Sequence, residues 1–300
     1  MKHLDPNSNA ARDLREGRYV IRPQTPADLA CVTIPWMREA GWNLGLHDAE
    51  TFPIADPRGF LVGELEGEPI ACVSGVRYDE SFGFMGCYIV REGFRGQGYG
   101  MAVHEAAREH LKGCTQGGDG VLANVSKYQQ IGRVYAYRNA RYQGVRDAGW
   151  TPSGSTVPVT DLDPSGVERL ERACFPAARK AFLEAWLRQP DAWALGIPGS
   201  RGESEPKAFG VIRRCFEGWK IGPLFARDPG SAECVFRDLV HRISTGDAFV
   251  LDVAEPNTAA LELVRRHGMT EVFATARMYT GPAPRIRLDW VYGVTTFELG

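Results

Sequence analysis

The sequence predicts an α/β protein built from two similar halves. Helix-like and strand-like patterns alternate along the chain, and the order helix–helix, strand–strand, helix, strand, helix, strand occurs twice. Residues 151–165 hold the densest cluster of Pro, Ser, Gly and Thr, which is the composition of a linker. Because 300 residues are enough for two domains, we predict domains over residues 1–150 and 166–300, joined by this linker.

The first half opens with a polar stretch whose first dozen residues we expect to be frayed, followed by a strand over 18–23. A helix begins at residue 25, since Thr25 is a good N-cap and Pro26 suits the first helical position. Pro35 lacks the N–H that a helix interior requires, so it is expected to end or kink this helix.

Strands and helices then alternate through the rest of the first half. The pattern predicts the following elements: a hairpin over 59–79 turning at residues 66–68, a buried strand over 82–90, a helix around 103–112, a strand over 120–125, a short helix over 126–132 and a strand over 134–144. The second half predicts a comparable set: helices over 164–175 and 176–188, strands over 207–214 and 219–226, a helix over 231–243, a strand over 248–254, a helix over 257–269 and a final strand over 291–300.

Composition argues against several classes of function. The formal net charge of −2 leaves no basic surplus to neutralise the phosphates of nucleic acid or an anionic membrane surface. No apolar run has the length of a membrane span, and the first residues lack a signal-peptide core. The seven cysteines form no C-x-x-C pair and the six histidines no H-x-x-x-H pair. We therefore expect reduced thiols, no metal site and a cytoplasmic protein.

A glycine-rich loop connects the 82–90 strand to the next helix. Within REGFRGQGYGMAVHEAAREHL, Gly96, Gly98 and Gly100 occupy alternate positions directly after Arg95. Free backbone N–H groups at the start of a helix favour a bound phosphate, and glycine lets its oxygens approach the main chain. The guanidinium of Arg95 adds a positive charge of suitable shape. A side chain at Gly98 is expected to block the phosphate at little cost to the helix.

The loop matches neither common nucleotide-binding pattern. No Lys-Ser or Lys-Thr follows it, and the final glycine of GxGxxG is missing. The remaining pattern, Arg95-x-x-Gly98-x-Gly100, resembles the acyl-CoA pyrophosphate loop of the GNAT superfamily of acyl-CoA-dependent N-acyltransferases. A simple glycine turn is the alternative for the motif alone.

A second motif extends the resemblance. Tyr128-Gln-Gln-Ile-Gly132 is similar to the family's Tyr-x-x-x-Gly-Phe signature, with Arg133 in place of the aromatic residue. The family's N-x-x-A run before the tyrosine is absent, because Val121 and Asn124 hold those positions. The family fold implied here has two tandem domains, each with a mainly antiparallel central sheet flanked by helices.

The resemblance implies the site residues and the reaction. An acetyl group would move from acetyl-CoA, as co-substrate, to an amine that attacks the thioester directly, without a metal. Tyr128 would hydrogen-bond the sulfur and protonate the departing thiolate, although a core tyrosine is the alternative. The implied cofactor-binding residues are those of the strand and loop: Tyr88, Ile89, Val90, Arg95, Gly96, Gln97, Gly98, Tyr99, Gly100 and Met101.

The second half resembles the C-terminal domain of two-domain bacterial GNAT proteins of unassigned substrate. It keeps an N-x-x-A run at Asn257 and Ala260, but Val264 replaces the tyrosine. Where the phosphate loop belongs, Pro229 lacks an N–H donor. The resemblance therefore implies a degenerate second domain without a cofactor site.

The acceptor is expected to be a small-molecule or peptide amine. Asp79 and Glu80 are candidates for the acceptor side, with solvated strand-end residues as the alternative. Trp36 and Trp42 are candidates for its wall, and core packing is the alternative. Two other functions stay open: an acyl-CoA-binding sensor without turnover, and an interaction protein with two degenerate halves, against which the intact loop argues.

Overall fold

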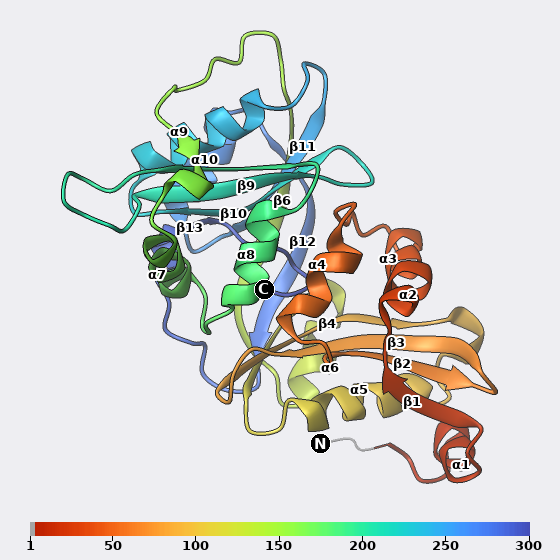
Figure 1. The fold of residues 1–300 in the computed structure, drawn as a ribbon. Coiled ribbons are helices and arrows are strands. Elements are labelled where there is room, and N and C mark those ends of the chain that lie inside the picture. Colours follow the sequence, from red (N-terminus) through yellow and green to blue (C-terminus); the bar gives the residue numbers. More distant parts are fainter. Residues whose placement is uncertain (1–3) are drawn as a thin grey trace.

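The computed structural model describes residues 4–300, which form two α/β halves joined along one continuous sheet of 13 strands (Figure 1). The sheet is mainly antiparallel and is flanked by helices, which confirms the predicted α/β class with a mixed sheet. Among the helices of residues 4–300, none combines the length and the apolarity needed to cross a membrane.

The elements follow one another in a similar order in each half. The first half contains α1 (Asn9–Arg15), β1 (Tyr19–Pro23), α2 (Pro26–Asp28), η1 (Leu29–Thr33), α3 (Ile34–Glu39), α4 (Asp48–Ala55), β2 (Phe60–Leu65), β3 (Glu68–Arg77), β4 (Phe82–Val90), η2 (Glu92–Phe94), α5 (Tyr99–His110), β5 (Thr115–Val121), η3 (Leu122–Asn124), α6 (Val125–Gln130) and β6 (Val134–Val145). The second half contains β7 (Val157–Pro158), η4 (Val159–Asp161), α7 (Pro164–Cys174), α8 (Lys180–Arg188), β8 (Ala192–Ile197), β9 (Ala208–Arg214), β10 (Trp219–Ala226), α9 (Pro229–His241), β11 (Ala248–Ala254), α10 (Thr258–Arg266), β12 (Thr270–Tyr279), η5 (Leu288–Trp290) and β13 (Val291–Gly293).

The two halves exchange strands at the centre of the sheet. The strand order is β1-β2-β3-β4-β5-β12-β6-β11-β10-β9-β8-β7, so β12 of the second half lies between β5 and β6 of the first. Strand β6 in turn lies between β12 and β11 of the second half. In Figure 1 these two long strands run from one half to the other. A chain cut after residue 150 would therefore lack a central strand of its own sheet.

The first long helix is interrupted where the sequence predicts. The side chain of Thr25 accepts the N–H of Asp28, and the Asp28 carboxylate accepts the N–H of Thr25, which together form a capping box. After α2 the helix widens into the π-helical η1, and Pro35 lies in the first turn of α3. Because proline has no N–H to donate there, the wider turn accommodates it within one continuous helical segment.

The structure contains the predicted hairpin, but one predicted strand has other limits. Strands β2 and β3 are joined by Glu66 and Gly67, whose φ values of 53° and 87° fit the two central positions of a type I′ turn. The strand predicted over 120–125 is wrong in its limits, since β5 covers Thr115–Val121. Three glycines in that segment lower its strand propensity, so its pairing with β4 and β12 decides its conformation.

Three strands were not predicted and one was predicted too long. The short strand β7, which falls in the predicted linker, strand β8 and the exchanged strand β12 have no counterpart in the sequence prediction. The first four residues of β12 are exposed and its last five are buried, so it lacks an alternating pattern. The final strand ends at Gly293 instead of residue 300, because the following residues leave the sheet and enter the space between the halves.

The expectation that the first dozen residues are frayed is wrong for residues 9–12, which belong to α1. Residues 1–3 lie outside the described part of the chain. Ser8 caps the helix by accepting the Ala11 N–H, and Ala10 is buried against Tyr19 and Tyr99. Such a short helix is stable only through tertiary contacts, which its own sequence does not reveal.

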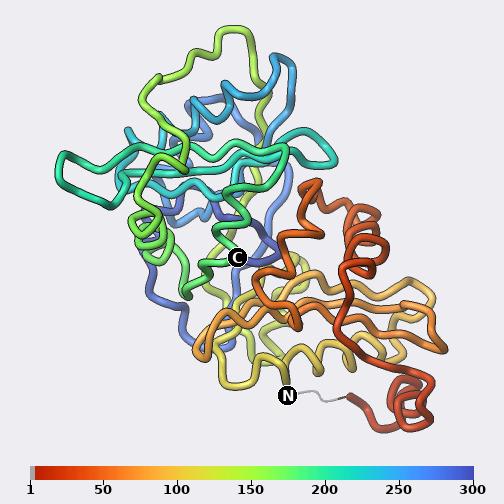
Figure 2. The backbone as a smooth tube through the Cα atoms, viewed as in Figure 1, coloured from red at the N-terminus to blue at the C-terminus, as the bar shows by residue number. Residues whose placement is uncertain are grey.

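The contact between the halves is apolar at its centre. One buried cluster combines first-half residues such as Phe52 and Phe60 with second-half residues such as Phe182 and Trp186, and also includes Leu299 near the chain end. Figure 2 shows that the chain ends between the halves. There the Tyr78 hydroxyl donates to the Leu299 carbonyl at 2.7 Å. The C-terminal segment is therefore part of the core that fixes the halves together.

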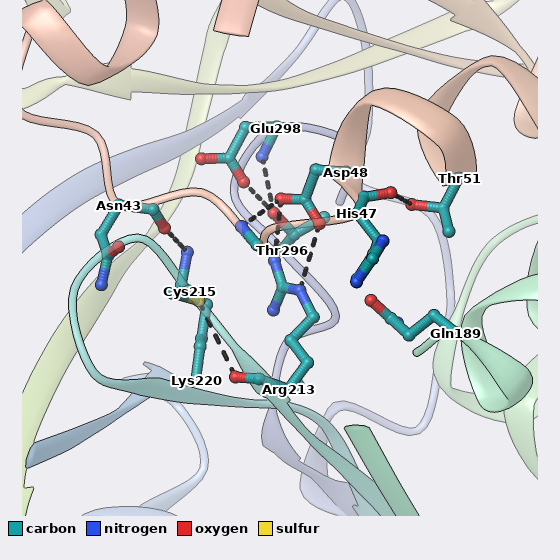
Figure 3. A network of polar contacts seen from close by, with 12 residues as sticks. Asn43, His47, Asp48, Thr51, Gln189, Arg213, Cys215, Lys220, Thr296 and Glu298 are labelled. Carbon is teal, nitrogen blue, oxygen red and sulfur yellow. Dashed lines mark hydrogen bonds and ion pairs between the residues drawn. The ribbon is translucent and has the colours of Figure 1, made fainter. Parts of the chain in front are cut away.

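A buried polar cluster crosses the same interface (Figure 3). Asp48 of the first half pairs with Arg213 of the second through two contacts of 3.2 Å, and both side chains are fully buried. Asp48 also accepts the Gly45 N–H at 2.7 Å. Lys220 donates to the Asn43 carbonyl. The interface thus contains a buried ion pair whose partners come from different halves.

Candidate functional site

Strands β4 and β5 begin as a parallel pair and then separate. They pair from Phe82–Phe84 to Thr115–Gly117, where their pairing stops. Cys87 has a φ of 49° and the β3–β4 register shifts beside it, so β4 carries a bulge near the point of separation. We call the opening between residues 85–90 of β4 and 118–121 of β5 the first-half V. Along these residues the facing edges of β4 and β5 pair with no strand of the described chain.

The corresponding opening in the second half is filled. Strands β10 and β11 pair in parallel only over Trp219–Ile221 and Phe249–Leu251. Beyond that point β13 pairs with β10, and the Val294 N–H donates to the Asp252 carbonyl of β11 at 2.9 Å. The chain's own residues 291–294 therefore occupy the space that remains open in the first half.

The predicted phosphate loop lies at the wide end of the first-half V. Gly96 and Gly98 have φ values of 75° and 94°, and α5 begins directly after them. No N–H group of residues 96–101 has a hydrogen-bond partner within residues 4–300. Arg95 is exposed and its Nε donates to the Val90 carbonyl at 2.9 Å, so its guanidinium is held beside the loop. A row of free N–H groups at a helix start, next to a cation, is suited to a phosphate.

The expectation that a side chain at Gly98 costs little stability is wrong. Its positive φ of 94° strains any other residue. A Cβ would also lie 2.7 Å from the Ser8 hydroxyl, because the N-terminal segment packs on the loop. The Ala10 N–H donates to the Gln97 carbonyl at 3.2 Å in the same region. A substitution at Gly98 would therefore disturb the fold as well as any bound phosphate.

Two tyrosines lie on the α5 side of the first-half V. A Cβ at Gly100 would lie 2.3 Å from the Tyr88 hydroxyl, so Tyr88 reaches from β4 to the first turn of α5. A Cβ at Gly120 would lie 2.4 Å from the Tyr128 ring, so Tyr128 covers β5 at this glycine. Burial raises the pKa of the Tyr88 hydroxyl, and the nearby Tyr128 adds to the effect. The structure thus brings Tyr88, Tyr128 and the loop around one opening.

The other predicted strand residues lie on the same edge. Ile89 pairs with Cys72 and Val90 with Ala71 on the β3 side, so their opposite backbone edge faces the first-half V. Tyr99 is buried, and its hydroxyl donates to Asp13 of α1 at 2.5 Å, so its side chain is structural. Met101 is half-buried in the first turn of α5.

Asp79 and Glu80, the candidates for contact with the acceptor, lie in a turn. Asp79 accepts hydrogen bonds from the N–H groups of Ser81 and Phe82, both at 2.8 Å. Burial alone would raise the pKa of Asp79, but these hydrogen bonds outweigh it and lower the pKa. Asp79 and the exposed Glu80 lie in the turn at the closed end of the V. Their positions do not favour a role with the acceptor.

The two tryptophans favour the packing alternative. Trp36 is buried, with the guanidinium of Arg91 5.4 Å from its ring centre. Trp42 packs against the apolar cluster between the halves. Trp42 therefore supports the interface between the halves, and the buried Trp36 does not line an open wall.

A histidine and an arginine without a predicted role lie at the narrow end of the V. The ring of His104 on α5 lies edge-on to Tyr88, 5.9 Å away. Burial, together with the nearby guanidinium groups of Arg133 and Arg108, lowers the pKa of His104 to about 4. The imidazole is therefore neutral at pH 7. Its sequence signal was weak, because it falls on the inward side of an amphipathic helix.

The described residues contain no group of three or more His, Cys, Asp or Glu side chains arranged to hold a metal ion. The described cysteines are free thiols. The groups described around the first-half V are backbone N–H groups, tyrosine hydroxyls, a neutral histidine and arginines.

Comparison with known proteins places this geometry in a family. The model of the acetyltransferase (GNAT) family matches residues 25–137, and that of an acetyltransferase (GNAT) domain matches residues 167–293. Holothin acyltransferase from Pseudoalteromonas sp. (strain SANK 73390) is 27% identical over 267 residues, which are 88% of this chain and 89% of that protein.

Solved structures show the same fold. A putative acetyltransferase from Pyrococcus horikoshii has a TM-score of 0.77 at 23% identity, covering 94% of this chain and 96% of that chain. A tandem GNAT protein from the clavulanic acid biosynthesis pathway has a TM-score of 0.59 at 13% identity, covering 88% and 99%. The two family models together show that this chain belongs to the GNAT superfamily, whose members generally use acyl-CoA. It is an acyltransferase with two tandem GNAT domains.

Proposed function

We propose that the first half transfers an acetyl group from acetyl-CoA to an amine by direct attack, and that the second half is degenerate and binds no cofactor. The proposed domain limits are 1–150 and 166–300, with residues 151–165 as linker. The observation that carries the proposal is the difference between the two openings. The first-half V is open beside a loop with free N–H groups, whereas residues 291–294 fill the second.

The loop and strand residues supply the cofactor contacts in this proposal. The N–H groups of residues 96–101 and the guanidinium of Arg95 bind the pyrophosphate. The backbone of Tyr88, Ile89 and Val90 runs along the pantetheine arm. The proposal includes no metal, and the free N–H groups and the arginine supply the contacts to the phosphate oxygens.

Tyr128 is the proposed catalytic acid. Its ring lies on β5 above Gly120, and its hydroxyl has no hydrogen-bond partner within residues 4–300. It is therefore available to donate to the sulfur of a cofactor lying in the first-half V. In the transfer, the amine nitrogen bonds to the thioester carbon, the carbon–sulfur bond breaks, and the thiolate takes the proton of the Tyr128 hydroxyl. The amine nitrogen releases one proton to solvent as the amide forms, and the tyrosinate regains one from solvent.

The acceptor, a small-molecule or peptide amine, is proposed to approach between the halves. Side chains alternate along β5, so Asp119 points to the face opposite Tyr128. There it pairs with Arg277 of the exchanged strand β12 through contacts of 3.0 and 2.8 Å. The C-terminal segment lies on β4 at the same face, with the Glu298 carbonyl next to Gly86. Both halves thus contribute to the acceptor side.

Calorimetric titration of the intact chain with acetyl-CoA is expected to give one site per chain. Only the first half offers free loop N–H groups and an open V, whereas Pro229 at the start of α9 has no N–H and β13 fills the second opening. Two equivalent sites would contradict the proposal.

A screen of amines, with detection of the released thiol, tests turnover separately. Release of CoA that depends on an added amine is expected. Binding of acetyl-CoA without transfer to any amine of the screen would favour the sensor function instead.

A further inference from the structure

A polar pocket of about 240 Å³ continues from the narrow end of the first-half V. It lies between α5, the loop after α6 and the start of β5. Its lining contains two arginines, one histidine and no carboxylate: His104, Arg108, Gln116, Ile131, Gly132, Arg133 and Thr280. We call it the arginine pocket.

Arg133 links this pocket to the V. Its Nη1 donates to the Gln116 carbonyl at 2.9 Å and its Nη2 lies 3.4 Å from the Met85 sulfur. A Cβ at Gly118 would lie 3.9 Å from Nη1. Met85 and Gly118 are the first residues after β4 and β5 separate. The guanidinium therefore lies at the vertex of the V, two residues along β5 from the Gly120 that Tyr128 covers.

The position of Arg133 is also unusual in sequence. It directly follows the glycine of the Tyr128–Gly132 motif, where the family signature has an aromatic residue. An aromatic ring there would present an apolar surface to this pocket. A guanidinium presents fixed N–H donors and a positive charge.

The charge of Arg133 is not balanced by a carboxylate. Within residues 4–300 its guanidinium contacts a carbonyl oxygen and a sulfur. Burial and the neighbouring Arg108 lower the pKa of Arg133 to about 10, so the guanidinium is poorly solvated but still charged at pH 7. A desolvated cation without a counter-ion is costly to the fold, and an anion in the pocket would offset this cost.

Two further polar atoms on the wall lack partners. His104 Nδ1 and Gln116 Oε1 are buried and have no hydrogen bond within residues 4–300. Gln116 is only 7% exposed. Because buried polar atoms are normally satisfied, the pocket is suited to polar contents, either a ligand or water held beside it.

We propose that the arginine pocket takes the far end of an acyl group that carries a carboxylate, so that the enzyme accepts a short dicarboxylic acyl-CoA such as succinyl-CoA in addition to acetyl-CoA. This inference rests on the proposed function, because it places the thioester in the first-half V. The transfer itself is unchanged. The amine gains the succinyl group as an amide, the carbon–sulfur bond breaks, and CoA leaves as the thiol. The carboxylate pairs with Arg133 and takes no part in bond making.

Calorimetry with CoA, acetyl-CoA and succinyl-CoA tests the proposal without a known acceptor. The wild-type chain is expected to bind succinyl-CoA roughly 10- to 100-fold more tightly than acetyl-CoA, which is the range of a hydrogen bond to a charged group. In Arg133→Gln this preference is expected to disappear, while the affinity for acetyl-CoA stays within about twofold. The control is Lys112→Gln, an exposed cation beyond the end of α5, which should keep the preference.

Other results of the calorimetry overturn the inference, either alone or together with the proposed function. Equal affinities for acetyl-CoA and succinyl-CoA in the wild-type chain overturn the inference and leave the proposed function intact. If Arg133→Gln weakens CoA and both acyl forms equally, the pocket binds a phosphate of the cofactor, and the inference is again overturned. If none of the three ligands binds, the proposed function and the inference fail together. A cooperative unfolding transition, measured for each variant, shows that the variant is folded.

Discussion

Tyr128→Phe is expected to lower kcat by about 10²- to 10⁴-fold while leaving the affinity for acetyl-CoA nearly unchanged. The hydroxyl has no structural partner within residues 4–300, and the ring keeps its contact with Gly120, so packing is preserved. Protonation of the leaving thiolate occurs only as the carbon–sulfur bond breaks. Its loss therefore appears in kcat rather than in ground-state binding. The measurement is steady-state kinetics with an amine identified by the screen, combined with calorimetry of acetyl-CoA.

The matched control for this experiment is Tyr135→Phe, which removes the same hydroxyl from an exposed residue of β6. It should retain wild-type kcat. Gly120→Ala tests the position of the Tyr128 ring independently. The added Cβ would lie 2.4 Å from this ring and displace it. Full activity in Tyr128→Phe would show that Tyr128 is a packing residue and not the proton donor.

Asp48→Ala is expected to destabilise the whole chain by about 3–5 kcal/mol, because it leaves the charge of Arg213 buried without its partner. Both side chains are fully buried, and Nη1 of Arg213 already lacks a partner within residues 4–300. A loss of this size is a large share of the ~5–15 kcal/mol that typically stabilises a protein. Because Asp48 and Arg213 belong to different halves, the loss acts on the contact between them (Figure 3). Denaturant unfolding followed by tryptophan fluorescence measures it.

Two variants show whether burial is the cause. Asp48→Asn keeps an oxygen for the Gly45 N–H and should lose less stability than Asp48→Ala. Lys112→Ala removes one partner of the exposed ion pair with Glu109 and should cause no measurable change, since solvent screens that pair. Equal midpoints for Asp48→Ala and Lys112→Ala would show that the buried pair contributes nothing to joining the halves.

The candidate site residues could be proposed from the sequence where a local backbone signature marks them. Gly96 and Gly98 adopt the positive φ values that only glycine tolerates easily, and the helix after them follows its apolar stripe. Tyr128 was found through its spacing from Gly132, which also has a positive φ of 86°. The proximity of Tyr128 to Tyr88 could not be predicted, because it depends on how far β4 and β5 diverge.

Sequence analysis assigned no role to His104 or Arg133. His104 is unremarkable beside its chain neighbours, and Arg133 was noted only as the replacement of the aromatic residue after Gly132. The two residues lie on different elements. They meet only because α5 and the loop after α6 pack on the same face of the first-half V. Asp79, in contrast, was a candidate from the sequence but has a structural role. It appeared exposed and available in the sequence, whereas in the structure it accepts hydrogen bonds from its own turn.

The sequence by itself determined the α/β class, the repeated order of elements, the capped and interrupted helix at Thr25 and Pro35, and the glycine loop. Each is encoded within a few residues, through side-chain periodicity, capping or the freedom of φ. Only the tertiary structure decided that β6 and β12 exchange between the halves, that residues 291–294 fill the second opening, and that α1 packs on the loop. These features depend on contacts between segments far apart in the chain, and the partner of a strand is chosen by the register and burial of the whole sheet.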